Sequence, residues 1–156
     1  MKCKAPLQFA IYLCMIFTVT SCHWGGNKGY NSKQLKKLNV QCETFAMQLQ
    51  TDTLRDAANK YLQCTTKGSK DYFQAIHFLI LSDFNAHDYA TVLSRIDKIE
   101  TQPDFNRYPD IGCRYQYTKA RAFQFEQKYN QAIDVFKSCI KYESTDDSLQ
   151  EHIRTV

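Results

Sequence analysis

The sequence predicts an all-α protein, and three observations support this class. Apolar residues recur at helical spacing from Ser32 onward. Only 5 glycines and 3 prolines occur in 156 residues, so helix breakers are sparse. The chain has neither an Asn-Gly nor an Asp-Gly dipeptide, and no alternating run of apolar and polar residues competes with the helical pattern.

Turn and cap residues divide this region into six expected helices, at about 32–49, 53–64, 70–85, 88–100, 109–128 and 130–142. Thr51 and Asp52 are expected to cap the second helix. Pro109 suits the first turn of the fifth. Ser144 opens a capping-box pattern, which predicts a short C-terminal helix after the sixth, either a capping helix or a truncated next unit.

The second, fourth and sixth helices share apolar residues at relative positions 0, 3, 7 and 10. The pattern starts at Leu54, Tyr89 and Tyr129, and one helix precedes each copy. Its period of roughly 35 to 40 residues is typical of helix–turn–helix repeats. The sequence therefore predicts three antiparallel helical hairpins.

The last unit resembles a tetratricopeptide repeat (TPR) in Ala120, Phe123, Tyr129, Ala132, Phe136 and Cys139. In that family, small residues let the two helices approach and aromatic residues fill the space between units. Cys139 replaces the usual alanine, Gln127 and Lys128 replace the glycine before the turn, and the first two units match more loosely. The resemblance implies a TPR-like right-handed superhelix, with a generic helical solenoid or bundle as the alternative.

The repeat register also predicts the core. Its expected members are Phe45, Leu54, Ala57, Tyr61, Ile80, Val92, Ile96, Ala120, Phe123, Ala132 and Phe136. Solvent exposure of Ala120 or Phe136 would contradict the register.

The first 21 residues have the pattern of a secretory signal. Lys2 and Lys4 precede an uncharged, mostly apolar stretch over 5–19, which would rise about 22 Å as a helix and is too short to span a bilayer. Val19-Thr20-Ser21-Cys22 resembles a bacterial lipobox, which implies cleavage before Cys22 and lipid attachment to its sulfur. An ordinary signal peptide or a helical anchor is the alternative.

Residues 22–31 contain three of the five glycines and are expected to form a flexible tether, with residues 32–156 as the helical domain. The positive net charge of +4 comes from residues 1–42, which hold six lysines and no acidic residue, because residues 43–156 hold 14 basic and 16 acidic residues. This distribution argues against nucleic-acid binding. The first acidic residue is Glu43, and the lack of acid beside Cys22 favours the periplasmic face, with the outer membrane as the expected anchor.

Four cysteines would remain after processing and lipidation: Cys42, Cys64, Cys113 and Cys139. In an antiparallel hairpin the start of one helix lies beside the end of the other. A Cys113–Cys139 disulfide fits this rule well, and a Cys42–Cys64 disulfide fits it less well. Export would permit oxidation. The alternative is that the thiols pack as small buried side chains.

The fifth helix carries a basic and aromatic stripe that suits an extended peptide or an acidic chain end. Its members fall within about 80° of one another and are Arg114, Tyr117, Arg121, Phe125 and Lys128. Arg121 is central and is expected to contribute most, and His77 lies on the comparable face of the third helix. The alternative is that Tyr117 and Phe125 pack against a neighbouring helix while the cations are solvated.

The chain offers little for catalysis or metal binding. Asp83 and His87 are four residues apart, but no third ligand is in register. Nucleophile and phosphate-loop motifs are absent, so we expect neither an enzyme nor a cofactor.

Two functional hypotheses remain. The preferred one is a lipid-anchored periplasmic scaffold that binds a protein or an extended peptide in an envelope complex. The alternative is a periplasmic sensory module of a longer TPR-containing signalling protein, of which this chain is a short or truncated form.

Overall fold

The computed structural model describes residues 31–139. The predicted signal peptide, the predicted lipid attachment at Cys22 and the predicted capping helix from Ser144 lie outside the described residues. The predicted tether includes residue 31, but Asn31 is the N-cap of the first described helix. Between residues 31 and 139, no helix combines the length and apolar character needed to cross a membrane.

The all-α prediction is confirmed, since residues 31–139 form helices and no strand. The elements are α2 (Ser32–Met47), α3 (Thr51–Gln63), α4 (Lys70–Asn85), α5 (Tyr89–Glu100), the 3₁₀ helix η1 (Phe105–Arg107), α6 (Pro109–Phe125) and α7 (Tyr129–Cys139). The predicted starts agree with these bounds to within two residues, and the start of α3 was predicted too late because Thr51 and Asp52 were taken as its caps. The predicted ends of α2 and α6 extend two or three residues too far, because both helices end at tight turns that lack glycine.

Side-chain caps begin three of the helices. Asn31 accepts a hydrogen bond from the Lys33 N–H, Ser69 accepts one from the Tyr72 N–H, and Asp88 accepts one from the Thr91 N–H. The predicted caps of α3 were wrong. Its N-cap is Gln50, which makes no side-chain capping bond. Asp52 lies in the first turn, where its negative charge interacts favourably with the helix dipole.

Each hairpin closes through the same turn. One residue adopts the left-handed conformation, with φ of 54° at Leu49, 61° at His87 and 60° at Gln127. The next residue donates its N–H to a carbonyl five residues earlier, at 3.0 Å (Gln50 to Phe45), 3.0 Å (Asp88 to Asp83) and 2.9 Å (Lys128 to Phe123). This is a helix-ending bond that usually accompanies glycine. Here three residues other than glycine adopt this strained conformation, so no glycine marks the turns in the sequence.

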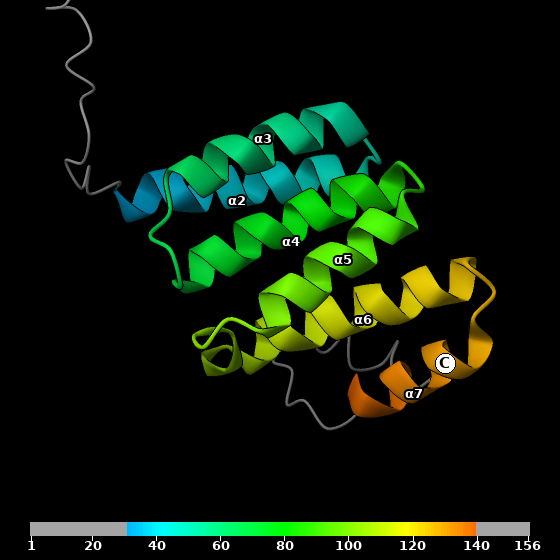
Figure 1. Ribbon diagram of the computed structural model, residues 1–156. Helices are drawn as coiled ribbons and strands as arrows, with labels where there is room; N and C mark the ends of the chain where they lie inside the picture. Colours follow the sequence, from blue (N-terminus) through cyan, green and yellow to red (C-terminus); the bar gives the residue numbers. More distant parts are fainter. Residues whose placement is uncertain (1–30, 140–156) are drawn as a thin grey trace, which may run out of the picture.

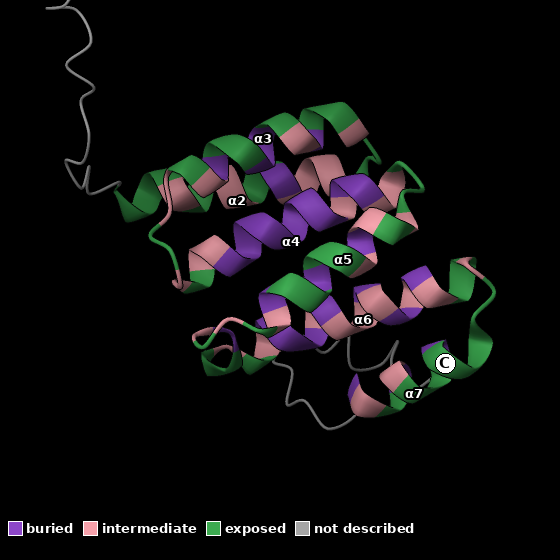
Figure 2. Cartoon of the chain, in the orientation of Figure 1, coloured by how far each residue is buried: buried purple, intermediate pink, exposed green. Residues whose placement is uncertain are grey.

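The three hairpins α2–α3, α4–α5 and α6–α7 follow one another in chain order, as Figure 1 shows. The central helix α4 contacts α2 and α3 on one side and α5 and α6 on the other. Ten of its 16 residues are therefore buried, and α4 is largely purple in Figure 2. This explains why α4 is apolar around most of its circumference, as expected of a helix enclosed by neighbours.

The predicted core register is confirmed. Nine of the eleven expected residues are buried, including Ala120 (0% exposed) and Phe136 (8% exposed). The two exceptions, Phe45 and Phe123, are partly buried and pack at the edges of core clusters. Phe123 is near the end of α6, where the Lys128 ammonium lies 6.0 Å from its ring centroid.

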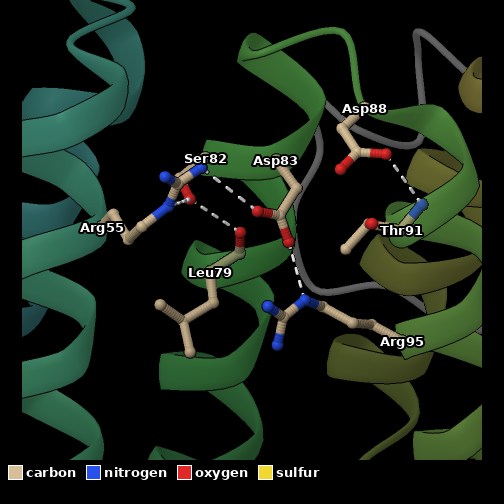
Figure 3. A network of polar contacts seen from close by, with 7 residues as sticks. All are labelled: Arg55, Leu79, Ser82, Asp83, Asp88, Thr91 and Arg95. Atoms are coloured by element: carbon tan, nitrogen blue, oxygen red, sulfur yellow. Dashed lines mark hydrogen bonds and ion pairs between the residues drawn. The ribbon is translucent and has the colours of Figure 1, made fainter.

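A buried carboxylate joins three helices near the turn of the second hairpin (Figure 3). The Asp83 side chain is 8% exposed, and its two oxygens lie 3.3 Å from Arg55 Nη2 of α3 and 2.7 Å from Arg95 Nε of α5. The Ser82 hydroxyl accepts from Arg55 Nε at 3.4 Å and donates to the Leu79 carbonyl at 2.9 Å. Asp83 thus serves the packing of α3, α4 and α5.

Candidate functional site

A groove runs across the first helices of all three hairpins. Its cavity is about 370 Å³, which is within the size range of small-ligand sites. The lining residues come from α2, α3, α4 and α6 and are Ser32, Leu35, Lys36, Asn39, Glu43, Tyr61, Lys70, Asp71, Gln74, Asp110, Ile111 and Arg114. We call this surface the first-helix groove.

The groove is built from equivalent positions of the three hairpins. Lys36, Gln74 and Arg114 lie at the same sequence distance before the left-handed residue of their own turn. Ser32, Lys70 and Asp110 each lie one helical turn further from that residue. Because one turn returns to nearly the same helix face, each first helix presents one repeated stripe to the groove. The groove is therefore a product of the repeat.

The charges of the groove are mixed and partly paired. Lys70 Nζ lies 2.6 Å from Asp110 Oδ2, which links α4 to α6. The Tyr61 hydroxyl donates to Asp71 at 2.5 Å, and burial together with this bond raises the pKa of Tyr61. The Asn39 amide donates to Glu43 at 2.8 Å. A ligand in the groove would therefore meet cations, carboxylates and amides, several of which are held in position by hydrogen bonds or ion pairs with one another.

His77 lies beneath the surface, between α4 and α6, and is 5% exposed. Thr118 donates its hydroxyl to the Arg114 carbonyl at 2.9 Å, so it accepts from His77 Nε2 at 3.2 Å. Burial, and secondarily the charge of Arg114, lowers the pKa of His77 to about 3. His77 is thus a neutral residue of the helix interface, buried below the position at which we expected a ligand contact.

The structure divides the predicted basic and aromatic stripe of α6 among several places. Arg114 lines the first-helix groove. Tyr117 packs edge-on against Phe136 of α7, with ring centroids 5.9 Å apart. Lys128 lies beyond α6 and pairs with Glu126 at 2.8 Å. These side chains do not form one continuous binding surface.

The remaining two stripe residues belong to an aromatic cluster at the turns. The Phe125 ring stacks on Tyr89 at 5.3 Å and meets Phe84 edge-on at 5.6 Å. The Arg121 guanidinium lies 5.3 Å from the Phe125 ring centroid. We call Phe84, Tyr89, Arg121 and Phe125 the turn-end cluster. It joins the carboxyl ends of α4 and α6, and Phe125 remains 50% exposed.

The contribution of α2 to the groove was not predicted from the sequence. Lys36, Asn39 and Glu43 precede Leu49 by the same intervals by which Arg114, Tyr117 and Arg121 precede Gln127. Counting back from the turns identifies them once the left-handed residues are known from the structure. Between the first two units, the apolar pattern of the second helices repeats after fewer residues than the turns do. A repeat register based on that pattern therefore misplaces α2 by nearly one helical turn.

The cysteines between residues 31 and 139 are not joined by disulfides. Cys113 and Cys139 are both 0% exposed and pack in one small cluster with Tyr117. Cys42 is buried in a different cluster, between α2, α3 and α4, and burial raises its pKa to about 12. Cys64 is partly exposed just after α3.

Within the described part of the chain, no group of three His, Cys, Asp or Glu residues is arranged to hold a metal ion. Asp83, which lies four residues before His87 in the sequence, instead forms ion pairs with Arg55 and Arg95. Comparison of the chain with protein-family models, curated proteins and solved structures finds no match.

Proposed function

We propose that this protein is an interaction module that binds an extended peptide segment of another protein in the first-helix groove. The observation that carries the proposal is the repeated stripe. Lys36, Gln74 and Arg114 occupy equivalent positions on three consecutive first helices and line one cavity. A row of equivalent positions on neighbouring helices suits a linear ligand, whose own residues also repeat at regular intervals.

The dimensions support a short peptide. Neighbouring packed helices are about 8–10 Å apart, so three first helices span roughly 16–20 Å. An extended chain advances about 3.3 Å per residue, so about five or six residues would cross the groove. The paired charges around Lys70 and Asp110 favour a ligand with both polar and charged side chains over a purely apolar one.

We extend the proposal to the architecture and the location. The three hairpins form a TPR-like right-handed array, in which first helices line the inner face. The lipobox-like segment ending at Cys22 anchors the array to the bacterial envelope, at the periplasmic face of the outer membrane. The function is then that of a membrane-tethered scaffold in an envelope complex.

Site-specific photocrosslinking tests this proposal. The full chain, expressed in a bacterial host, carries a benzophenone amino acid at Lys36 in the groove or at Lys98, an exposed position on α5. We expect a discrete crosslinked partner from Lys36 and none from Lys98. The Cys22→Ala variant should lose fatty-acid labelling and the same crosslink.

The charge-reversal variant Lys36→Glu measures the contribution of the groove to affinity. We expect partner binding to weaken about tenfold or more, the range for loss of one charge-assisted contact. Lys98→Glu is the matched control and should bind normally. Equal crosslinking from both positions, or unchanged affinity of Lys36→Glu, would place the interface elsewhere on the molecule.

A further inference from the structure

Two cysteines face each other inside the last hairpin. Cys113 of α6 and Cys139 of α7 are both 0% exposed and form one packed cluster, with Tyr117 at its edge. The helices that carry them pack closely, as expected from the buried Ala120 and Ala132 between them. Two thiols in one small cluster are the arrangement from which a disulfide forms with little backbone movement.

The positions of the cysteines relative to the turns distinguish the Cys113–Cys139 pair from the Cys42–Cys64 pair. Cys113 and Cys139 lie at nearly equal sequence distances before and after Gln127, so they are offset by about 3 Å along the helix axes. Cys64 lies about twice as far after Leu49 as Cys42 lies before it, which gives an offset of about 12 Å. The small offset between Cys113 and Cys139 is compatible with a disulfide. The larger offset between Cys42 and Cys64 does not permit a disulfide unless the helices rearrange.

We propose that Cys113 and Cys139 are a redox modification site, at which an intramolecular disulfide fixes α7 to α6, whereas Cys42 and Cys64 remain thiols. This proposal does not depend on the proposed peptide binding. It assigns a chemical role to two residues that the first-helix groove does not use. The disulfide would close the loop 113–139, which contains the turn at Gln127 and all of α7.

The oxidant is a disulfide of the glutathione class. One cysteine thiolate attacks a sulfur of oxidised glutathione, the glutathione S–S bond breaks, and one glutathione thiolate leaves. The second cysteine thiolate attacks the resulting mixed disulfide and releases the second glutathione. Two electrons pass from the cysteine sulfurs to the glutathione, and the two protons end on the two glutathione thiols.

Burial controls when this exchange occurs. It raises the pKa of Cys139 to about 12, with a further contribution from Cys113, so the docked Cys139 thiol is almost entirely protonated. The thiolate is the reacting species, and the exchange therefore requires α7 to open or the pair to meet the oxidant before α7 docks. Within the described residues α6 is the main neighbour of α7, which makes α7 a natural unit of local opening.

Peptide mapping of the full chain tests the pairing. The chain is unfolded, refolded with oxidised glutathione, alkylated and digested with trypsin. We expect peptide 108–114 linked to peptide 138–141, with a mass two hydrogen atoms below the sum of the two thiol peptides. Peptides 38–55 and 61–67, which contain Cys42 and Cys64, should be alkylated separately. Separate alkylation of 108–114 and 138–141, or linkage of either to another cysteine, would overturn the proposal.

Thermal unfolding tests the stabilising role. We expect the oxidised chain to melt about 10 °C above the reduced chain, as expected for closing a loop of this length in a small domain. Cys139→Ala should abolish the difference, and the double variant Cys42→Ala, Cys64→Ala should retain it. An unchanged or lower melting temperature of the linked chain would show that the disulfide does not fix α7, even if the linked peptide forms.

Discussion

The first helices of the hairpins, α2, α4 and α6, are open to solvent along one part of their shared face, and α4 and α6 are closed by packed side chains near the turns. Over the amino-terminal halves of α4 and α6, and over α2 as far as Glu43, the helices leave the first-helix groove open between them. At the carboxyl ends of α4 and α6, beside the turns, Asp83 is enclosed by Arg55 and Arg95, and the turn-end cluster fills the space between helices. One end is therefore available for ligands, while the other maintains the spacing of the hairpins.

A repeated helix stripe therefore does not by itself define a binding surface. Arg114 and Arg121 lie on one stripe of α6, but Arg114 lines the groove and Arg121 lies against Phe125. The difference comes from residues on other helices, chiefly Phe84 and Tyr89. Substitutions at the closed end should therefore change stability, and substitutions at the open end should change binding.

The largest expected effect follows removal of the buried carboxylate. Asp83→Ala leaves Arg55 and Arg95 facing each other across an uncharged gap near the turn of α4 and α5. We expect a loss of about 2–3 kcal/mol in the free energy of unfolding, below the usual loss for a fully buried pair because both arginines are partly exposed. Urea denaturation measures this. Asp97→Ala, at an exposed carboxylate on α5, should lose less than about 0.5 kcal/mol.

Acid should weaken the packing of α4 against α6 through His77. Its pKa is about 3 in the folded chain and 6.5 when exposed, so the unfolded state takes up a proton first as the pH falls. Stability is then complete above pH 6.5 and is lost progressively down to pH 3, with about 2 kcal/mol lost at about pH 5.

Urea denaturation between about pH 7 and about pH 5 measures this loss. His77→Gln should remove this part of the pH dependence. His87→Gln, at an exposed histidine, should leave it unchanged. An equal pH dependence in the wild type and His77→Gln would show that His77 is not the titrating group.

A smaller effect is expected at the turn-end cluster. Arg121→Ala removes the cation beside the Phe125 ring and should reduce the free energy of unfolding by about 0.5–1 kcal/mol. Partner affinity should change much less than it does in Lys36→Glu. A large loss of affinity with unchanged stability would return Arg121 to the binding surface, as the sequence alone suggested.

The smallest expected change is a gain. Gln127 is held at φ 60°, where an L-residue is strained and glycine is not. Gln127→Gly should therefore raise the free energy of unfolding by up to about 1 kcal/mol. Gln124→Gly, three residues earlier and inside α6, should lower it by about 0.5–1 kcal/mol. Opposite signs for these two variants in thermal unfolding would confirm the role of the turn.

Most of the fold could be predicted from the sequence because it depends on the spacing of apolar residues. The buried positions of Leu54, Ile96 and Ala132 follow directly from that spacing. The groove could not be predicted in the same way, since it depends on how three hairpins are aligned. That alignment depends on contacts between helices of different hairpins, such as α3 with α4 and α4 with α6, which the apolar spacing within one helix does not specify.

The turns also explain why the repeats look irregular. From turn to turn, the second interval is slightly longer than the first, although Gln74 and Arg114 keep the same distance from their turns. The difference arises mainly in the connections at the opposite edge, where 101–108 is longer than 64–69 and places Phe105 in the core. A search with a fixed period would lose its alignment from one unit to the next. Distant relatives of this chain are better aligned outward from their turns, with gaps allowed only at the far edge.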